Sequence, residues 1–467
     1  MNTRVHSQKM SILTSTSPTV SKTKMGFLSM MAICIGLVIV QGAMIAATQG
    51  IGIGGSAFIA ALICAYLLAQ FNAMSFAELS LMFPKEGTLA TYTKKAIGHF
   101  PAIVAVFSGY VFVSILAMPV EMFLVDAMLN QLFPGVFPEK LVPIALLATL
   151  TITNLIGTDV FSKIQNLLAF VLVVALIMIG FVAITGIDSP HPVITQNAVD
   201  WSLNGVLDGS FIGLIALAMW LMVGVEFICP MIQQVDNPNK TIPRAMSWSL
   251  TAILLIFLAF AYGASLYLDT QTLLESPIPY LNYANAVFGP VGLFIATLMA
   301  IAATCSSMNT LLASIPLMMS GMAEEGQAFP QLKVKNKHGV PWVGVLFISI
   351  STSISFLISD ADSILILVIA ATTSWLFAYM ITHVDVIVLR RRLPNISRPY
   401  KTPFYPIPQI LGIVGMGYVA LHNSPSPEMT QLVFTIAGGI LLSLSIISAI
   451  WVKFFMKKGL FTPDMSD

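Results

Sequence analysis

Charged residues are scarce in this sequence. Only 9% of the 467 residues are Asp, Glu, Lys or Arg, whereas 57% are hydrophobic. A soluble domain carries roughly a quarter charged residues, so this chain cannot cover its surface with solvated side chains. Its net charge of +1 offers no field that would attract nucleic acid. The composition therefore predicts an all-α integral membrane protein that lies in the lipid bilayer.

Cysteines and metal-ligand spacings are equally sparse. The four cysteines (Cys34, Cys64, Cys229 and Cys305) fall in apolar segments without paired spacing, so we expect neither disulfides nor a metal site. The sequence has no His-x-x-x-His or Glu-x-x-His spacing and no nucleophile with a base nearby in sequence. We therefore expect no cofactor and no enzymatic activity.

Long apolar runs, by contrast, occupy almost the whole chain. A membrane helix needs about 20 apolar residues. The runs predict twelve transmembrane helices, near residues 27–48, 55–83, 101–130, 141–157, 161–186, 208–233, 246–268, 284–321, 341–359, 361–389, 407–422 and 431–455. A glycine-rich turn at 49–55 is expected between the first two.

The distribution of Lys and Arg predicts the orientation. With the N-terminus inside, the outer connections hold a single cation, Lys140, and the other cations outside the spans fall on the inner side. The positive-inside rule then places both termini in the cytoplasm. Residues 1–24 are polar and are expected to be a disordered cytoplasmic tail. The expected location is the bacterial cytoplasmic (inner) membrane.

Two spans contain polar and glycine residues where a helix would be interrupted. The first is Val40-Gln41-Gly42-Ala43-Met44 in span one, and the second is Gly224-Val225-Glu226 in span six. Transporters often bind their substrates at such breaks, and a single glycine can equally serve close helix packing. Spans one and six hold equivalent positions in a five-plus-five repeat, so the pair favours a substrate site.

Four short motifs occur in order along the chain. They are Gly224-Val225-Glu226 followed by Asp236-Asn237-Pro238-Asn239-Lys240-Thr241-Ile242-Pro243-Arg244-Ala245; Ala77-Glu78-Leu79 with Pro84 and Gly87; Met322-Ala323-Glu324-Glu325-Gly326 with Gly339-Val340-Pro341; and Arg398-Pro399-Tyr400-Lys401-Thr402-Pro403. On these motifs the chain resembles the amino acid–polyamine–organocation (APC) superfamily of permeases, from about Gly26 to the last span.

The resemblance implies a leucine-transporter-type fold with discontinuous helices 1 and 6. It places the first inverted repeat in 25–186, the second in 205–392 and two further helices in 407–458, before a cytoplasmic tail at 459–467. It also implies alternating-access transport of amino acids or related amines, by proton symport or by obligate exchange. Some members of the superfamily dimerise, so a homodimer stays open.

The two breaks suggest how a substrate would be held. The free N–H groups of Gly42, Ala43 and Met44, at a positive helix end, would bind a carboxylate. Carbonyl groups near Val40 and Val223 would accept from an ammonium. The expected substrate-binding residues are Val40, Gln41, Gly42, Ala43, Met44, Ser114, Met118, Glu121, Trp220, Val223, Gly224 and Glu226.

Three side chains carry the more specific hypotheses. Trp220 stands four residues before Gly224, the spacing of the arginine/agmatine-antiporter branch, where such an aromatic closes over the substrate; the alternative is an interfacial anchor. Glu226 either carries a proton or is simply held by the backbone at the break. Glu121, with Ser114 and Met118, aligns with pocket positions of that branch, and a carboxylate there favours a cationic substrate; the alternative is an interhelical hydrogen bond.

A polar cluster in span eight is the candidate for ion coupling. Ser306, Ser307 and Asn309 join Trp220 and Glu226 as the expected coupling or gating residues. Hydroxyl groups facing span one would suit sodium, and they are also common between packed helices. Some superfamily members have a lysine in the second half of span five that replaces a sodium ion, and this chain has none there. We expect proton coupling rather than sodium coupling. A transporter-like nutrient sensor remains an alternative function.

Overall fold

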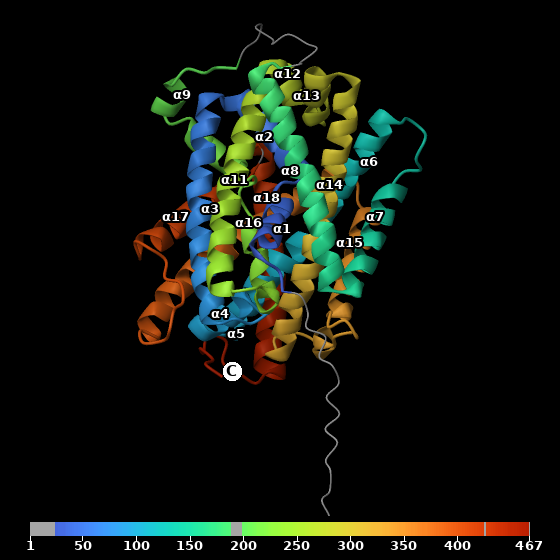
Figure 1. Ribbon diagram of the computed structural model, residues 1–467. Helices are drawn as coiled ribbons and strands as arrows, with labels where there is room; N and C mark the ends of the chain where they lie inside the picture. The colour runs from blue at the N-terminus through green and yellow to red at the C-terminus, as the bar shows by residue number, and fades with distance from the viewer. Residues whose placement is uncertain (1–23, 188–198, 425, 467) are drawn as a thin grey trace, which may run out of the picture.

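The computed structural model describes residues 24–187, 199–424 and 426–466, in which every regular element is a helix. Except for Lys24, the predicted N-terminal tail lies outside these residues. The helices stand side by side as an upright bundle (Figure 1). In chain order the elements are α1 (Phe27–Val38), α2 (Gln41–Gly54), α3 (Ser56–Met82), α4 (Leu89–Ala96), α5 (His99–Val106), η1 (Phe107–Phe112), α6 (Val113–Leu132), α7 (Leu141–Ile156), α8 (Thr158–Thr185), α9 (Asn204–Leu207), α10 (Phe211–Met219), η2 (Val225–Gln234), α11 (Pro238–Tyr267), α12 (Thr270–Glu275), α13 (Pro279–Phe288), α14 (Pro290–Glu324), η3 (Pro330–Lys333), α15 (Trp342–Ile358), α16 (Ala361–Arg392), α17 (Ile407–Leu421), α18 (Pro427–Ile450) and η4 (Trp451–Phe455).

Seven helical segments of the described chain are long and apolar enough to cross a membrane. The helices α1 and α2 pass the same test together, although they are bent by 63° at a break of two residues. Three shorter apolar helices, α7, α15 and α17, accompany them. The exposed face of α8 carries large apolar side chains such as Leu167, Phe170 and Phe181, as a lipid-facing helix requires.

Two expected boundaries are different in the structure. The glycine-rich segment 49–55 is mostly helical, because α2 continues to Gly54 and the chain reverses at Gly55 alone. Gly55 has φ +47°, and a Cβ there would lie 2.0 Å from the carbonyl oxygen of Asp200, so only glycine fits. The eighth span, expected from residue 284, begins at Pro290 because α13 ends at Phe288 and the chain turns at Gly289 (φ +64°).

One long segment contains a π-helical turn. The elements α5, η1 and α6 follow one another without a gap from His99 to Leu132, and η1 (Phe107–Phe112) is a π-helix. A π-helical turn accommodates an extra residue within an otherwise α-helical segment, often at a functional site. Tyr110 within this turn is buried, and Glu121 lies three turns further along.

Two of the four motifs, the one at Ala77-Glu78-Leu79 and the one at 398–403, meet at the end of the bundle where the C-terminus lies (Figure 1). Glu78 accepts two hydrogen bonds from Arg390, at 2.8 and 2.7 Å, and one from the N–H of Thr402 at 2.8 Å. Gly321 approaches Gly87 so closely that an added Cβ would lie 2.2 Å from the Gly87 nitrogen. These contacts explain why small and charged residues recur there among apolar ones.

Candidate functional site

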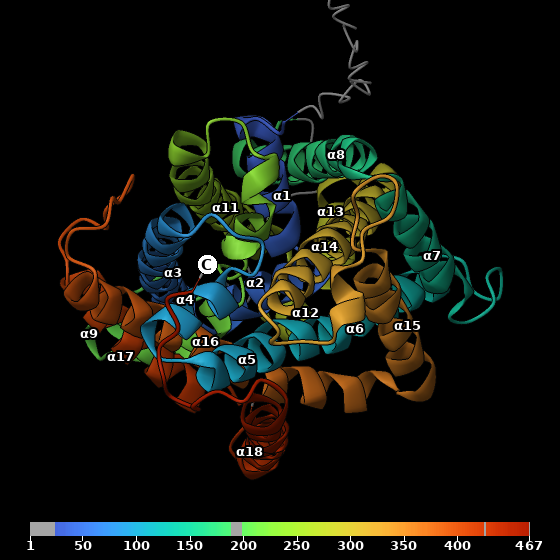
Figure 2. The same ribbon diagram turned by 90° about the horizontal axis from the view of Figure 1, so that it is seen from below.

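The break in the first span lies near the middle of the bundle, where α1 and α2 lie among α3, α11 and α14 (Figure 2). Ile39 and Val40 are extended, so α2 starts afresh at Gln41. The first N–H groups of a helix have no acceptor within the helix and carry its positive dipole end. Val40 precedes α2 as its N-cap residue and forms no side-chain cap. The start of α2 therefore needs an acceptor from elsewhere.

That acceptor is Glu121, 80 residues along the chain. Its Oε2 accepts from the N–H of Gln41 at 3.0 Å, and its Oε1 accepts from the N–H of Gly42 at 3.1 Å. The Thr304 hydroxyl donates to Oε2 at 3.1 Å. Three residues expected to bind substrate, Gln41, Gly42 and Glu121, are thus in contact, and a protein carboxylate occupies the helix end expected to bind the substrate carboxylate.

Gln41 extends this network to two other helices. Its Nε2 donates to the Thr304 hydroxyl of α14 at 2.7 Å, and its Oε1 accepts from the hydroxyl of Tyr280 in α13. Gln41 and Tyr280 are both fully buried. Polar groups buried this deeply are stable only when paired, so the network fixes α2 against α13 and α14.

The second break touches the first. Between α10 and η2 the chain is not regular, and Gly224 has φ +120°, a conformation that strongly favours glycine. A Cβ on Gly224 would lie 3.3 Å from Leu37 and 3.5 Å from Val38 at the end of α1. The two interrupted segments predicted from glycine positions are therefore in direct contact.

Glu226 lies just beyond the second break among aromatic rings. The Tyr379 hydroxyl donates to its Oε1 at 2.7 Å, whereas Oε2 has no hydrogen-bond partner among the described residues. The Phe227 ring lies 5.3 Å from that of Tyr110 and 6.0 Å from that of Trp375. A carboxylate with a free oxygen beside aromatic faces suits a cationic group or a proton.

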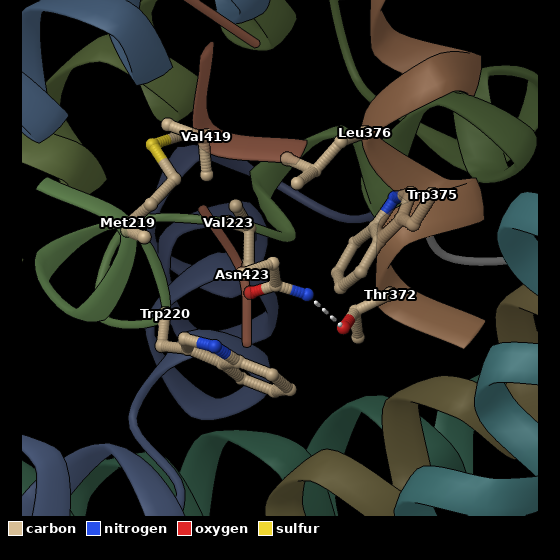
Figure 3. Close-up of a pocket in the computed structure, with 9 residues that line it drawn as sticks. Met219, Trp220, Val223, Thr372, Trp375, Leu376, Val419 and Asn423 are labelled. Carbon is tan, nitrogen blue, oxygen red and sulfur yellow. Dashed lines mark hydrogen bonds between the residues drawn. The ribbon is translucent and has the colours of Figure 1, made fainter. Parts of the chain in front are cut away.

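A small cavity lies beside these rings (Figure 3). Its volume is about 20 Å³, room for one water and not for an amino acid. Trp220 and Val223 line it from the second break, and Trp375 and Thr372 line it from α16. Asn423 lies at the same cavity and donates to Thr372 at 3.0 Å. Trp220 thus forms part of the cavity wall.

The expected coupling residues of α14 belong to a separate network. Gln165 of α8 donates from Nε2 to the Ser306 hydroxyl at 2.7 Å and to the Ala32 carbonyl of α1 at 3.2 Å. Its Oε1 accepts from Asn309 at 2.9 Å, and Asn309 accepts from Asn154 of α7 at 2.8 Å. An amide nitrogen thus occupies the position between α1 and α14 where sodium, the less favoured alternative, would need free hydroxyl and carbonyl oxygens.

The remaining predicted residues are buried with local partners. The Ser114 hydroxyl donates to the Tyr110 carbonyl at 2.7 Å, and the Ser307 hydroxyl donates to the Thr304 carbonyl at 2.9 Å. Met118 is 1% exposed and contributes to the apolar core. The N–H of Met44 donates to the Val40 carbonyl at 3.1 Å, so neither of these groups is free. Ala43, like Met44, is buried.

Several members of these networks were not predicted from the sequence. Gln165, Tyr280, Trp375 and Tyr379 were not singled out. A glutamine inside an apolar span is costly and therefore a signal that could have been used. The aromatic residues gave no signal, because Phe, Tyr and Trp are common throughout such spans.

A family model described as amino acid permease matches residues 25–458. The chain belongs to the amino acid permease family. This confirms the APC superfamily membership that the motifs predicted and makes the permease a multi-pass membrane protein.

Two characterised relatives cover most of the permease. It is 24% identical to the serine/threonine exchanger SteT of Bacillus subtilis over 410 residues, 85% of this chain and 90% of that protein. It is 23% identical to the cystine/glutamate transporter of Homo sapiens over 431 residues, 89% and 83% of the two chains. The branched-chain amino acid permease BcaP of Bacillus subtilis is 22% identical, and the match covers 91% of this chain and 93% of that protein. Such relatives therefore include both exchangers and permeases.

A solved structure supports the fold. A manganese transporter of Eremococcus coleocola matches with a TM-score of 0.59 and 14% sequence identity, over 92% of this chain and 95% of that one. At this identity the likeness concerns the helical arrangement alone.

Proposed function

We propose that the permease carries amino acids or related amines across the cytoplasmic membrane by alternating access, coupled to protons. The observation that carries the proposal is the contact of the second break, at Gly224, with Leu37 and Val38, which end α1 next to the first break, beside a small cavity. Irregular backbone at membrane depth is tolerated where it lines a binding site. Rocking of one half of the bundle against the other would open this site to either side.

The architecture within this proposal is twelve spans in a five-plus-five inverted repeat. The seven long segments, the bent pair α1–α2, the three shorter helices and the broken segment α10–η2 would supply these spans. Both termini would then lie in the cytoplasm. A bacterial inner membrane and a homodimer remain part of the proposal on the resemblance alone.

The contacts of Gln165 and the free oxygen of Glu226 favour proton coupling over sodium coupling. Gln165 places an amide nitrogen against the oxygens of Ser306 and Ala32, where a cation would need free acceptors. Glu226, with one unpartnered oxygen, is the candidate proton carrier. Obligate exchange is the second candidate, supported by the relative described as a serine/threonine exchanger.

Reconstitution in proteoliposomes tests the proposal. Uptake of a panel of radiolabelled amino acids and amines is measured with and without an inward proton gradient, and with and without substrate inside the vesicles. Stimulation by the gradient supports symport, whereas a strict requirement for internal substrate replaces it by exchange. If no compound in the panel is taken up, the transport function is wrong and the nutrient-sensor alternative takes its place.

A further inference from the structure

Glu121 occupies the position at which the helix dipole of α2 would attract a carboxylate. It accepts from the N–H groups of Gln41 and Gly42 with one oxygen each, as a bound substrate carboxylate would. Its side chain comes from α6 and is buried, with 7% of the residue exposed. A substrate carboxylate at the same place would have to displace Glu121 or lie against a like charge at hydrogen-bonding distance.

The acceptor capacity of Glu121 is not exhausted. A carboxylate offers about four acceptor positions. Gln41 and Thr304 use two positions on Oε2, and Gly42 uses one on Oε1. One position on Oε1 therefore remains available for a further donor.

The open space lies on the side of that oxygen. Gly42 is partly exposed, whereas Gln41 and Ala43 on either side of it are buried. A Cβ on Gly42 would lie 3.3 Å from Glu121 Oε1 and would meet nothing else within 4 Å in the described chain, apart from its own turn and neighbours. A donor of about the size of an ammonium group fits beside Gly42 against Oε1.

We propose that Glu121 takes the place of a substrate carboxylate, so that the permease selects amines without an α-carboxylate and binds their ammonium group at Oε1. The proposal rests on the proposed transport function and narrows its substrate class. The ammonium supplies the positive partner that the Glu121 carboxylate lacks, whereas an amino acid would bring a second negative charge to the same helix end. The permease therefore discriminates between amine and amino acid both by attraction of the ammonium and by repulsion between the two carboxylates.

Matched pairs of compounds test the selectivity without any mutation. The pairs are an amino acid and the amine formed by its decarboxylation: arginine and agmatine, lysine and cadaverine, histidine and histamine. Uptake into proteoliposomes is measured for each member, together with competition between the two. We expect one or more amines to be taken up with a KM lower than that of the parent amino acid by about tenfold or more, the value of one charge-assisted hydrogen bond. Equal or better uptake of the parent amino acid in every pair that is transported overturns the inference and leaves the transport function standing.

Two variants locate the effect. Glu121→Gln retains one acceptor oxygen and removes the charge, and we expect it to lose the preference for the amine. Gly42→Ala places its methyl group 3.3 Å from Oε1, a tight contact that a small shift of the Glu121 side chain relieves, and within 4 Å of no other atom of the described chain outside its own turn and neighbours. We therefore expect normal expression and nearly unchanged thermal stability, with weaker uptake of the amine. Unchanged amine preference in a correctly folded Gly42→Ala protein contradicts the inference even if Glu121→Gln fails to fold. Absence of uptake for all six compounds and the wider panel removes the transport function itself, and the inference with it.

Discussion

Gln165 donates a hydrogen bond to Ser306 across 2.7 Å and thereby joins α8 to α14 beneath the first break. Its amide also contacts the Ala32 carbonyl, and its oxygen accepts from Asn309. One uncharged side chain thus pairs with three groups from two other helices, α1 and α14. This arrangement keeps α1 in contact with both α8 and α14.

Sodium replacement tests the role of this contact. We expect the initial rate of uptake to be the same in sodium and in N-methylglucamine buffers, because the Gln165 amide occupies the acceptors of the site. Gln165→Ala leaves these groups unpaired and should lower the free energy of unfolding by about 1–3 kcal/mol. Thermal unfolding in detergent measures the loss. The matched control is Asn166→Ala, whose side chain donates an exposed hydrogen bond to the Ser29 hydroxyl at 3.1 Å. Strong stimulation of the wild-type protein by sodium would contradict this interpretation.

The packing of α1 on α14 depends on Gly36. A Cβ at this position would lie 1.8 Å from the Ser306 hydroxyl oxygen and 3.0 Å from its Cβ. We expect Gly36→Ala to destabilise the protein by about 1–3 kcal/mol through overpacking. Adding Ser306→Gly removes both Ser306 atoms and leaves Gln165 Nε2 at 2.7 Å from the added Cβ, so it should restore part of the thermal stability. Gly213→Ala on α10, where the described chain offers no atom within 4 Å, should change little.

The ion pair of Glu78 and Arg390 should be the most costly polar contact to break. Glu78 is fully buried, and Arg390 donates one hydrogen bond to each of its two carboxylate oxygens. Arg390→Met removes the bidentate partner and leaves Arg398 Nε, 3.5 Å from Oε1, as the remaining cation beside Glu78. We therefore expect a loss of about 1.5–3 kcal/mol in unfolding free energy. Arg391→Met removes the same charge from an exposed position and is the control. Similar melting temperatures for both variants would show that the pair adds little.

Trp220 should affect transport more than stability. It lines the cavity beside Trp375, and an aromatic contact with a substrate is worth about 0.5–1.5 kcal/mol. Trp220→Ala should therefore raise the KM of uptake by about twofold to tenfold. Trp342→Ala, at an exposed position at the start of α15, should leave KM unchanged. An equal effect of both substitutions would indicate general destabilisation rather than a role at the cavity.

Asp464 connects the C-terminal segment to α4 and α5. It accepts from His99 at 2.8 Å and from Lys458, and its N–H donates to the Lys94 carbonyl at 2.9 Å. Burial alone would raise the pKa of Asp464, but the hydrogen bonds from Lys458 and His99 outweigh it and hold the pKa below its usual range. A lowered pKa in the folded state stabilises the fold above the usual pKa, and this contribution is lost as the pH falls toward the folded-state value.

We expect Asp464→Asn to lower the melting temperature at pH 7 relative to the unchanged protein. The difference should shrink as the pH falls below about 4, because the Asp464 carboxyl is then protonated in the unfolded chain. Thermal unfolding at a series of pH values measures this. Glu428→Gln, on an exposed first turn of α18, serves as the control. A difference that does not change with pH would assign the effect to packing rather than to charge.

The sequence allowed the two breaks to be predicted but not what each break binds. Gly42 and Gly224 stood out because glycine and polar residues interrupt apolar runs, and both lie where regular helix stops or starts. The contact of Glu121 with α2 depends on how α6 packs against a segment 80 residues away, which no local pattern encodes. The Gln41 and Gln165 networks are hidden for the same reason: a polar residue in a span indicates that a partner exists and says nothing of which helix supplies it.

The π-helical turn Phe107–Phe112 has a consequence for how specificity could arise in this fold. Each residue of an α-helix rotates the following side chains by about 100°. Deleting one residue from this turn would make the segment α-helical and rotate Glu121 about 100° away from Gln41 and Gly42. The start of α2 would then be open to a substrate carboxylate, with every side chain of α2 unchanged. A single insertion or deletion far from the break could thus change the class of substrate, solely by rotating the following side chains about the helix axis.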